Sequence, residues 1–400
     1  MPLGISKKAA RIAPSATLAL NAKVNAMRAA GEKVVNFASG EPDFDTPVAI
    51  RDATKDALDH GKTRYTAASG IPELRKAIKD KLLKENGLDY DISQIVVSNG
   101  AKHALFNTFF ALLNEGDEVI VPMPCWVSYP EMIKMCGGVP VFAQTYEKDN
   151  FVLKAKDIEA VITPKTKVFM LTSPSNPNGS CWNREELQAL ADLAVKYDFY
   201  VMTDEIYEHL LYNGQKNISI ASLGQDIKDR TIVINGVSKT YAMTGFRIGY
   251  AAGPKDVMKA IAACQSQATS APNTPAQYAA IKALTMPQDS VEKMCQAYKE
   301  RRDVLVAGLN AIDGISCLKP DGAFYVMINV TQLIGKRKDG VLIDSDMTFA
   351  DQLLEHEKVA IVPGTAFMAP GFCRMTYSLS IEDIKIGLQA IRRFIESLTK

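Results

Sequence analysis

The chain has 400 residues, of which 47% are hydrophobic, and its 46 basic residues are balanced by 45 acidic residues. A formal net charge of +1 provides no general attraction for nucleic acid or for an anionic bilayer, so neither is expected as a partner. A chain of this length exceeds what one hydrophobic core usually organises, and two unequal domains are expected.

The cysteines and the N-terminal segment indicate the compartment. The seven cysteines are scattered, and none belongs to a Cys-x-x-Cys motif, so neither a disulfide framework nor a zinc cluster is expected. The four histidines are also far apart, and no metal is expected. Residues 1–21 lack an apolar stretch long enough for a signal sequence, and no later segment reaches membrane-spanning length. These patterns predict a cytoplasmic protein.

Helical periodicity and short apolar runs alternate from about residue 50 onward. Pro72 begins a predicted helix that Gly87 can end, and a second predicted helix spans residues 101–113. Asn183 and Glu186 resemble a capping box for a helix that runs to about residue 196. The predicted strands cover residues 95–98, 118–121, 139–143, 168–172, 199–203, 231–234 and 248–252. This alternation predicts an α/β fold with a mostly parallel, doubly wound central sheet.

The C-terminal third has a different character. A long predicted helix from about residue 290 to residue 310 leads into a section in which helices and strands are mixed. We interpret this section as a smaller α+β domain. The expected division is a large domain at residues 46–290, and a small domain at residues 291–400 that also includes the N-terminal segment 1–45.

A lysine follows the strand predicted at residues 231–234, and an arginine lies eight residues after that lysine. An ε-amine that can lose its proton forms a Schiff base with an aldehyde, which is a role open to Lys239. The guanidinium of Arg247 can hold a phosphate. Together these two residues indicate a site for pyridoxal 5′-phosphate, a cofactor that carries both an aldehyde and a phosphate.

Three polar residues follow other predicted strands, and each suits this cofactor. Asp204 would supply the carboxylate that keeps the ring nitrogen protonated, so that the ring draws electrons from a bound amino acid. Tyr207 could hydrogen-bond the phenolic oxygen, and Asn176 could donate both to that oxygen and to a substrate carboxylate. Taken alone, Asp204 could equally cap a helix, and Asn176 could belong to an ordinary Asn-Pro turn. Because ligands collect at the carboxyl ends of parallel strands, these residues and Lys239 are expected in one crevice.

Three further features are weaker when each is taken alone. The turn Gly100-Ala101-Lys102 joins a predicted strand to a predicted helix, whose first backbone N–H groups could bind a phosphate. Trp126 could stack on the pyridine ring or could be an ordinary core residue. Arg374 is an isolated charge in an apolar, strand-like segment and needs an anionic partner, either a substrate carboxylate or an internal aspartate.

Taken together, these residues make the chain resemble a class I aminotransferase of the fold type I pyridoxal phosphate enzymes, from about residue 14 to the C-terminus. The resemblance implies that Lys239 carries the cofactor as a Schiff base and moves the proton. It implies that Asp204 pairs with the ring nitrogen, that Tyr207 and Asn176 hold the phenolic oxygen, and that Trp126 stacks on the ring.

The resemblance also implies how the phosphate and the substrate are held. Gly40 and Arg374 would bind the substrate α-carboxylate. Tyr65 matches a residue that reaches the phosphate of a neighbouring subunit, which implies a homodimer with shared active sites. The family often has a serine three residues before the lysine, where this chain has Gly236, so one phosphate contact is missing or is made by Ser238. The remaining phosphate ligands would be Gly100, Ala101, Lys102 and Arg247.

Longer stretches resemble bacterial aspartate aminotransferases of the branch that also contains aspartate/prephenate aminotransferases. These stretches are residues 14–17, 40–47 and 126–132. In this branch the residues that match Thr17 and Lys102 bind a second, distal carboxylate, and an ammonium and a hydroxyl suit that purpose. A cation in the first turn of a helix is unfavourable unless an anion is present, which supports the same role for Lys102.

The expected reaction is therefore transfer of the amino group of aspartate or glutamate to a 2-oxo acid such as 2-oxoglutarate, by a ping-pong mechanism. The partners would be small-molecule amino acids and 2-oxo acids. Residues that hold two carboxylates do not separate aspartate from prephenate, so transfer to prephenate, which makes arogenate, is an alternative.

Three other classes of protein are alternatives to this interpretation. A carbon–sulfur lyase or an aminocyclopropane carboxylate synthase could use the same electron sink on the same scaffold, although Thr17 and Lys102 argue against it. A binding or regulatory protein would be expected to lack Lys239 or Asp204, and both are present. A dehydrogenase would need a G-x-G-x-x-G turn after its first strand, and the sequence has none.

Overall fold

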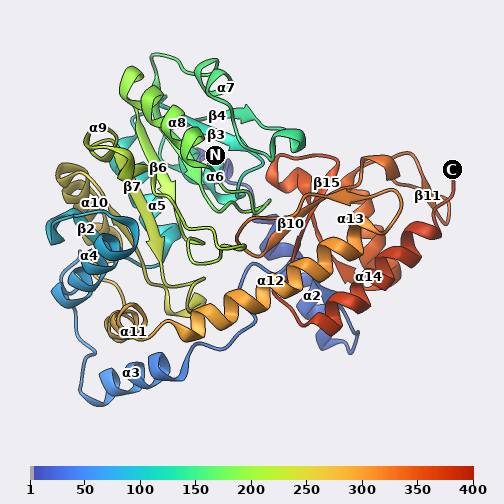
Figure 1. Cartoon of the computed structure of the whole chain (residues 1–400), viewed down its shortest axis with the longest axis horizontal. Helices are drawn as coiled ribbons and strands as arrows, with labels where there is room; N and C mark the ends of the chain where they lie inside the picture. The colour runs from blue at the N-terminus through green and yellow to red at the C-terminus, as the bar shows by residue number, and fades with distance from the viewer. Residues whose placement is uncertain (1–3) are drawn as a thin grey trace.

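A seven-stranded sheet, here called the large sheet, is the centre of the computed structural model, which describes residues 4–400 (Figure 1). The strand order is β2-β8-β7-β6-β5-β3-β4, and among these seven strands β8 alone runs antiparallel to its neighbours. The doubly wound, mostly parallel sheet predicted from the sequence is confirmed. Its strands are β2 (Ile95–Ser98), β3 (Glu118–Met123), β4 (Val139–Gln144), β5 (Thr166–Thr172), β6 (Tyr200–Asp204), β7 (Thr231–Gly236) and β8 (Gly249–Ala252).

Apolar side chains alternate along these strands and face a helical layer on each side of the sheet. On β5, Val168 and Met170 belong to one core, whereas Phe169 and Leu171 belong to the opposite core. Helices α5, α6 and α10 cover the first face, and α4, α8 and α11 cover the second. The helices of this part are α3 (Val48–Asp59), α4 (Pro72–Asn86), α5 (Ala101–Leu112), α6 (Ser128–Met135), α7 (Ala155–Glu159), α8 (Arg184–Tyr197), α9 (Gln225–Lys228), α10 (Lys255–Ala268) and α11 (Thr274–Thr285).

The predicted signals for helix ends are present. Pro72 occupies the first turn of α4, where its missing N–H costs nothing, and Gly87 ends that helix with a φ of 68°. At the start of α8, Asn183 accepts from the Glu186 N–H at 2.9 Å, and the Glu186 carboxylate accepts from the Asn183 N–H at 3.0 Å. The capping box predicted for this helix is therefore confirmed.

Two predicted strands begin one residue too early. β6 spans Tyr200–Asp204 instead of residues 199–203, because its ladder with β5 continues to the pair Thr172 and Asp204. Asp204 is thus the last residue of the strand and does not follow it. β8 begins at Gly249 instead of residue 248, because Arg247 has a φ of 58° that interrupts the extended backbone.

A four-stranded antiparallel sheet with the order β14-β15-β10-β9, here called the small sheet, forms the second part. Its strands are β9 (Ser316–Cys317), β10 (Tyr325–Asn329), β14 (Val362–Pro363) and β15 (Phe372–Thr376), and its helices are α12 (Asp289–Asn310), α13 (Asp346–Glu357) and α14 (Ile381–Glu396). The short pairs are β1 (Val35–Asn36) with β13 (Val359–Ala360), and β11 (Arg337–Lys338) with β12 (Val341–Leu342). The predicted domain boundaries, residues 45/46 and 290/291, stay a prediction, and residues 1–3 lie outside the described residues.

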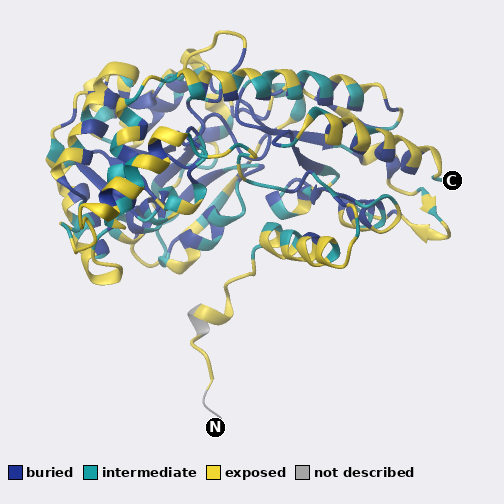
Figure 2. Ribbon diagram, turned by 90° about the horizontal axis from the view of Figure 1, so that it is seen from below, coloured by how far each residue is buried: buried dark blue, intermediate teal, exposed yellow. Residues whose placement is uncertain are grey.

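The two parts are joined by α12 and by the N-terminal region (Figure 1). Helix α2 (Ala16–Ala29) packs beside β14, whereas α1 (Lys7–Ala10) lies in a segment that reaches away from the body (Figure 2). The 3₁₀ turns are η1 (Ile92–Gln94), η2 (Glu147–Asp149), η3 (Ile220–Leu223), η4 (Thr244–Phe246), η5 (Thr331–Leu333) and η6 (Gly364–Phe367). Within residues 4–400, no helix is both long enough and apolar enough to span a membrane.

Removing the cap of α8 tests this account of the fold. Asn183→Ala is expected to lower the free energy of unfolding by about 1 kcal/mol, because one helix N–H loses its acceptor. Urea denaturation of the purified protein measures the change. Asn183→Asp, which keeps an acceptor, is the control and is expected to retain most of the stability. Equal stability of the alanine variant and the wild type would contradict a role for the capping box.

Candidate active site

A cavity of about 890 Å³ lies at the carboxyl ends of β5, β6 and β7. The residues for which the sequence predicts one crevice all line it. They are Asn176, Asp204, Tyr207 and Lys239. The starts of α2 and α5 add Thr17, Ala101 and Lys102 to the wall, and the small sheet adds Tyr325 and Arg374. Both parts of the molecule therefore contribute to one site.

Lys239 follows β7 and extends its amine into this cavity. Its Nζ donates a hydrogen bond to the carbonyl oxygen of Gly40 at 2.5 Å. Within residues 4–400, no carboxylate oxygen lies within 4.0 Å of this amine. Burial by the surrounding protein lowers the pKa of Lys239 to about 8, and Arg374 contributes in the same direction, although Glu41 opposes the shift. The amine is therefore partly deprotonated near neutral pH and can act as a nucleophile.

Asp204 ends β6, lines the cavity and is buried. The Tyr129 hydroxyl donates to one carboxylate oxygen at 2.7 Å, and the Ile206 N–H donates to the other at 3.2 Å. Burial raises the pKa of Asp204 to about 6, although these hydrogen bonds and Lys239 favour the ionised form. At pH 7 the carboxylate is ionised, with hydrogen-bond donors but no cation within ion-pair distance among the described residues.

Arg374 is 2% exposed and projects from β15. Its Nη1 donates to Asn176 Oδ1 at 3.0 Å and its Nη2 donates to the Ala38 carbonyl at 3.1 Å, whereas its buried Nε has no partner. Among the described residues, no carboxylate lies within 4.0 Å of the guanidinium, so the internal aspartate that the sequence left open is contradicted. Arg374 lines the cavity, and a buried guanidinium without an anion is costly.

Tyr207 and Tyr325 both line the cavity and contact each other. Their hydroxyl oxygens are 3.0 Å apart, and the Tyr207 ring packs edge-on against Phe324 with centroids 5.5 Å apart. Burial raises the pKa of both phenols, so both stay protonated and can donate. The Tyr325 ring also lies against the Arg374 guanidinium, 4.4 Å from its centroid.

The start of α5 and Arg247 form a region suited to an anion. Gly100 caps α5 with a φ of 88°, and a Cβ at this position would lie 2.4 Å from a nitrogen of Arg247. Glycine thus allows the guanidinium to lie against the helix start, where backbone N–H groups and the helix dipole favour negative charge. Ala101, Lys102, Ser238 and Arg247 line this end of the cavity.

Lys102, in α5, and Thr17, in α2, both line the cavity. The Lys102 amine is 4.7 Å from the centroid of a Trp126 ring, and no ion pair holds it among residues 4–400. Burial and the nearby Arg247 lower its pKa. The Thr17 hydroxyl is 3.0 Å from that of Ser15. Trp126 packs edge-on against Tyr129, with centroids 5.3 Å apart.

Tyr65 is 93% exposed, and it does not line the cavity of its own chain. It lies in the segment between α3 and α4. Within one chain, therefore, the structure brings all the other predicted site residues to or beside the cavity but leaves Tyr65 outside. A role for this phenol at an active site needs a second copy of the chain.

Gly236 has a packing reason. A Cβ on Gly236 would lie 2.8 Å from the Ile248 carbonyl oxygen and 2.9 Å from the Gly249 Cα. A serine at this position would collide with the start of β8. The side chain of Ser238 instead reaches the cavity wall.

Two aromatic residues of the site were missed at the level of sequence. Tyr129 donates to Asp204, and Tyr325 contacts both Tyr207 and Arg374. Each occurs in a short apolar run, where a tyrosine is typical of a core. Tyr129 lies three residues after Trp126, and Tyr325 follows the Gly322-Ala323 turn. These positions were the one available signal, and a position in the sequence does not show which way a side chain points.

The sequence matches the family model described as aminotransferase class I and II over residues 32–391. An aspartate aminotransferase of Geobacillus stearothermophilus is 44% identical, over 98% of this chain and 99% of its own length. An aspartate/prephenate aminotransferase of Thermus thermophilus is also 44% identical, over 98% of this chain and 99% of its own length. The crystal structure of an aspartate aminotransferase from Rhizobium meliloti superposes with a TM-score of 0.96 at 41% identity, covering 99% of this chain and 100% of that one.

Replacing the buried amine tests its electrostatics. Lys239→Met is expected to stabilise the ligand-free protein near pH 7, because the lysine pKa is about 8 in the fold and 10.5 in its ordinary state. This difference corresponds to about 3 kcal/mol. The unfolded chain binds more protons between these two values, so the wild type gains stability as the pH rises from 8 toward 10.5.

Urea denaturation of both proteins at about pH 7 and about pH 9.5 makes the measurement. The stability advantage of Lys239→Met should shrink at the higher pH. An advantage of equal size at both pH values would contradict the low pKa.

Proposed function

The chain belongs to the aminotransferase class I and II family, and we propose that this transaminase uses pyridoxal 5′-phosphate to move the amino group of aspartate or glutamate to a 2-oxo acid. The class I resemblance predicted from the sequence is confirmed by full-length relatives at 44% identity. The cofactor, the substrates and the role of each residue are the proposed parts.

One observation carries the proposal. A single cavity is lined by an amine with a pKa of about 8, on Lys239, and by a buried guanidinium that has no carboxylate within 4.0 Å among the described residues, on Arg374. The amine suits covalent attachment of an aldehyde, and the guanidinium suits an α-carboxylate. An amino acid presents its α-carboxylate beside the carbon that must lose a proton, so both groups are needed in one place.

The residues present fit the cofactor. Lys239 would hold its aldehyde carbon, and the ionised Asp204 would pair with its ring nitrogen. Tyr207 and Asn176 would bind its phenolic oxygen, and Trp126 would lie against its ring. The phosphate ligands would be Gly100, Ala101, Lys102, Ser238 and Arg247. When bound, the cofactor supplies an electron sink for the pair released from Cα–H.

Different side chains of the protein would then orient the substrate and transfer the proton. Arg374 and the Gly40 backbone would orient the α-carboxylate, and the amide of Asn176 is already aligned by its bond to Arg374. The amine of Lys239, once released, would accept the proton from Cα and would then donate it to the former aldehyde carbon of the cofactor. The amine needs its lowered pKa for this step, because an ordinary lysine would stay protonated.

Lys102 and Thr17 would bind the distal carboxylate of an acidic substrate. Lys102 supplies a cation that no described carboxylate neutralises, and Thr17 supplies a hydroxyl in the same cavity. The cavity continues past them to Asn21, Asn25 and Arg28, which favours prephenate as a second candidate acceptor. A relative from Thermus thermophilus bears the name aspartate/prephenate aminotransferase. A lyase would have no need of a second carboxylate site.

The proposed assembly is a homodimer with shared active sites in the cytoplasm. Its support is Tyr65, which is 93% exposed, outside the cavity of its own chain, and free to reach a second copy. Scattered cysteines without a Cys-x-x-Cys motif support the cytoplasmic location.

The reaction is tested by following the absorption of the protein-bound cofactor at ~430 nm, a general property of lysine-bound pyridoxal phosphate. Aspartate or glutamate is expected to bleach the band, and oxaloacetate, 2-oxoglutarate or prephenate is expected to restore it. Lys239→Ala is expected to fold and to show neither the band nor turnover, because the amine that would hold the aldehyde carbon and accept the Cα proton is removed. Turnover close to the wild-type rate in Lys239→Ala would overturn the assignment. Bleaching with release of pyruvate and ammonia, without recovery, would indicate a lyase.

The distal site is tested by Lys102→Ala. The Michaelis constant for aspartate and glutamate is expected to rise about tenfold or more, the effect of losing one hydrogen bond to a charged group. The Michaelis constants for alanine and phenylalanine should change far less. Lys76→Ala removes an exposed lysine of α4 that pairs with Asp80, and it is the matched control. Equal effects on acidic and neutral substrates would remove Lys102 from the distal site.

A further inference from the structure

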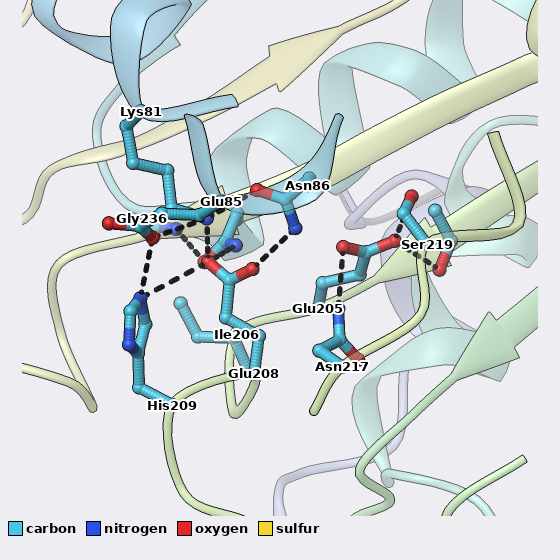
Figure 3. Close-up of polar contacts among 12 residues, drawn as sticks. Lys81, Glu85, Asn86, Glu205, Ile206, Glu208, His209, Asn217, Ser219 and Gly236 are labelled. Atoms are coloured by element: carbon cyan, nitrogen blue, oxygen red, sulfur yellow. Dashed lines mark hydrogen bonds and ion pairs between the residues drawn. The ribbon is translucent and has the colours of Figure 1, made fainter. Parts of the chain in front are cut away.

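Two buried carboxylates, those of Glu205 and Glu208, lie in the segment Asp204–His209 and make polar contacts with residues that do not line the cavity (Figure 3). Glu205 accepts from the Ser219 hydroxyl at 2.6 Å and from the Asn217 amide at 3.0 Å. Glu208 instead faces the end of α4, where Lys81, Glu85 and Asn86 gather. The two carboxylates flank Ile206 and Tyr207, and neither lines the cavity.

Glu208 connects three elements of the fold. Its Oε1 accepts from the Lys81 ammonium and from the Asn235 amide, the latter at 2.6 Å, and its Oε2 accepts from the Asn86 amide at 2.8 Å. Lys81 and Asn86 belong to α4, and Asn235 belongs to β7. The side chains of Lys81 and Glu208 are 4% and 6% exposed. One buried carboxylate thus ties the segment beside Tyr207 both to a helix and to the strand that leads to Lys239.

The surroundings of this pair define its charge. His209 Nε2 lies 3.1 Å from Glu85 and 3.7 Å from Glu208, and the Lys81 ammonium lies 3.5 Å from Glu85. Although burial alone would raise the pKa of Glu208, Lys81 and His209 hold it below its ordinary value. Lys81 also donates to Asn86 Oδ1 at 2.8 Å, so its ammonium already fills the position that a metal ion would need. The cluster is therefore a buried ion pair with its hydrogen bonds made.

Stability alone does not account for such a pair. Taking two charges out of water costs several kcal/mol for each ion, and apolar side chains of similar volume are often equally stable in their place. What the ion pair adds is a fixed geometry, because directional, charge-assisted bonds accept one arrangement of their partners. The geometry fixed here is that of the residues on either side of Glu208.

Those residues belong to the proposed active site. Tyr207 directly precedes Glu208, and Asn235 lies four residues before Lys239. Asn235 is itself fixed, because its Oδ1 accepts from the Gly236 N–H at 2.7 Å. The backbone adds one link between the two segments, from the Glu205 N–H to the Ile234 carbonyl at 2.9 Å. A shift of Glu208 would therefore move Tyr207 relative to Lys239.

We propose that Glu208, paired with Lys81, is a positioning residue that fixes the Tyr207 hydroxyl relative to the Lys239 amine through Asn235. It touches neither cofactor nor substrate and acts through the residues that do. This inference rests on the proposed transaminase site, and its test separates failure of the inference from failure of that proposal.

The test compares Glu208→Leu, Lys81→Met and the double variant as purified, cofactor-loaded enzyme. Each single variant leaves one buried charge without its partner and is expected to melt at a lower temperature than the wild type. The double variant should recover most of this loss, because no unpaired charge remains. Its kcat should stay about tenfold to a hundredfold below the wild-type value, since a small misplacement of reacting groups is costly. A kcat that recovers together with the melting temperature would overturn the proposal.

The Michaelis constant provides a second readout. For aspartate it should change by less than about threefold in the double variant, because the substrate-carboxylate residues Arg374, Thr17 and Lys102 lie outside the network. Leu190→Ala, a core truncation in α8, is the matched control and should lower the melting temperature without lowering kcat at 25 °C. If Leu190→Ala loses as much kcat as the double variant, the effect is general destabilisation and the proposal is wrong.

A readout that needs no turnover completes the test. Hydrogen–deuterium exchange of the peptide that covers residues 204–211 should be about tenfold faster in the double variant than in the wild type and in Leu190→Ala. Asn235→Ala removes the bond from Glu208 to β7, together with the side-chain bond to the Gly236 N–H, and leaves the Lys81–Glu208 pair in place. It gives the same comparison if the charge variants fail to fold, and it should also lower kcat more than it changes the Michaelis constant. Unchanged exchange overturns the inference whatever the wild type catalyses. A wild type without transamination overturns the proposed function instead.

Discussion

The common end of the parallel strands β5, β6 and β7 is the constraint on which the rest of the structure depends. Thr172 and Asp204 are paired across β5 and β6, and Asp204 is paired with Ile234 across β6 and β7. Because neighbouring strands are about 4.8 Å apart, the side chains that end or follow them must converge. Lys239 reaches the cavity from the loop after β7. Arg374 extends from β15 of the small sheet and donates a hydrogen bond to Asn176, which follows β5.

Charge in this cavity is compensated differently from charge elsewhere. Arg301 pairs with Asp43 at 2.8 Å, and Arg393 pairs with Glu357 at 2.6 Å. The cations that line the cavity have no carboxylate within 4.0 Å among residues 4–400. They are Arg28, Lys102, Lys239, Arg247 and Arg374. Arg374 is buried, where an unpaired cation is costly, and the other cations line the same cavity, so the folded chain is complementary to anions before any anion arrives. Carboxylates and a phosphate are the anions that the proposed reaction would supply.

The sequence predicted much of this site because its signals are local. Lys239, Asp204 and Asn176 end or follow apolar strands, and position along a strand is readable from alternation and from turn residues. The one-residue error at β6 arose because strand pairing, which no local pattern records, extends the ladder to Asp204. The Gly236 departure became understandable only once β8 was seen to approach its Cα.

Long-range contacts were beyond the reach of the sequence. Lys81 and Glu208 are 127 residues apart, and nothing near either residue indicates that they meet. Tyr129 and Asp204 are 75 residues apart and are joined by one hydrogen bond. A tyrosine in an apolar run is usually a core residue, so its hydroxyl can be assigned a partner only after the fold has placed it.

Residues 204–208, which begin at the last residue of β6, include three buried carboxylates, and each is compensated in a different way. Glu208 faces an ammonium, and its pKa is held low. Asp204 has only hydrogen-bond donors close by, and burial raises its pKa to about 6. Glu205 also has only neutral donors and lies near Glu208, and burial with that neighbouring charge raises its pKa to about 7.

Because of this difference, Asp204 is the carboxylate of this segment that places a negative charge at the cavity near pH 7. The charge of Glu208 is neutralised by Lys81, and neither Glu205 nor Glu208 lines the cavity. Asp204 does line it, and with a pKa of about 6 this carboxylate is mostly ionised at pH 7 while it accepts from Tyr129. A buried carboxylate that is ionised but lacks a cation is what the protonated ring nitrogen of pyridoxal phosphate would require.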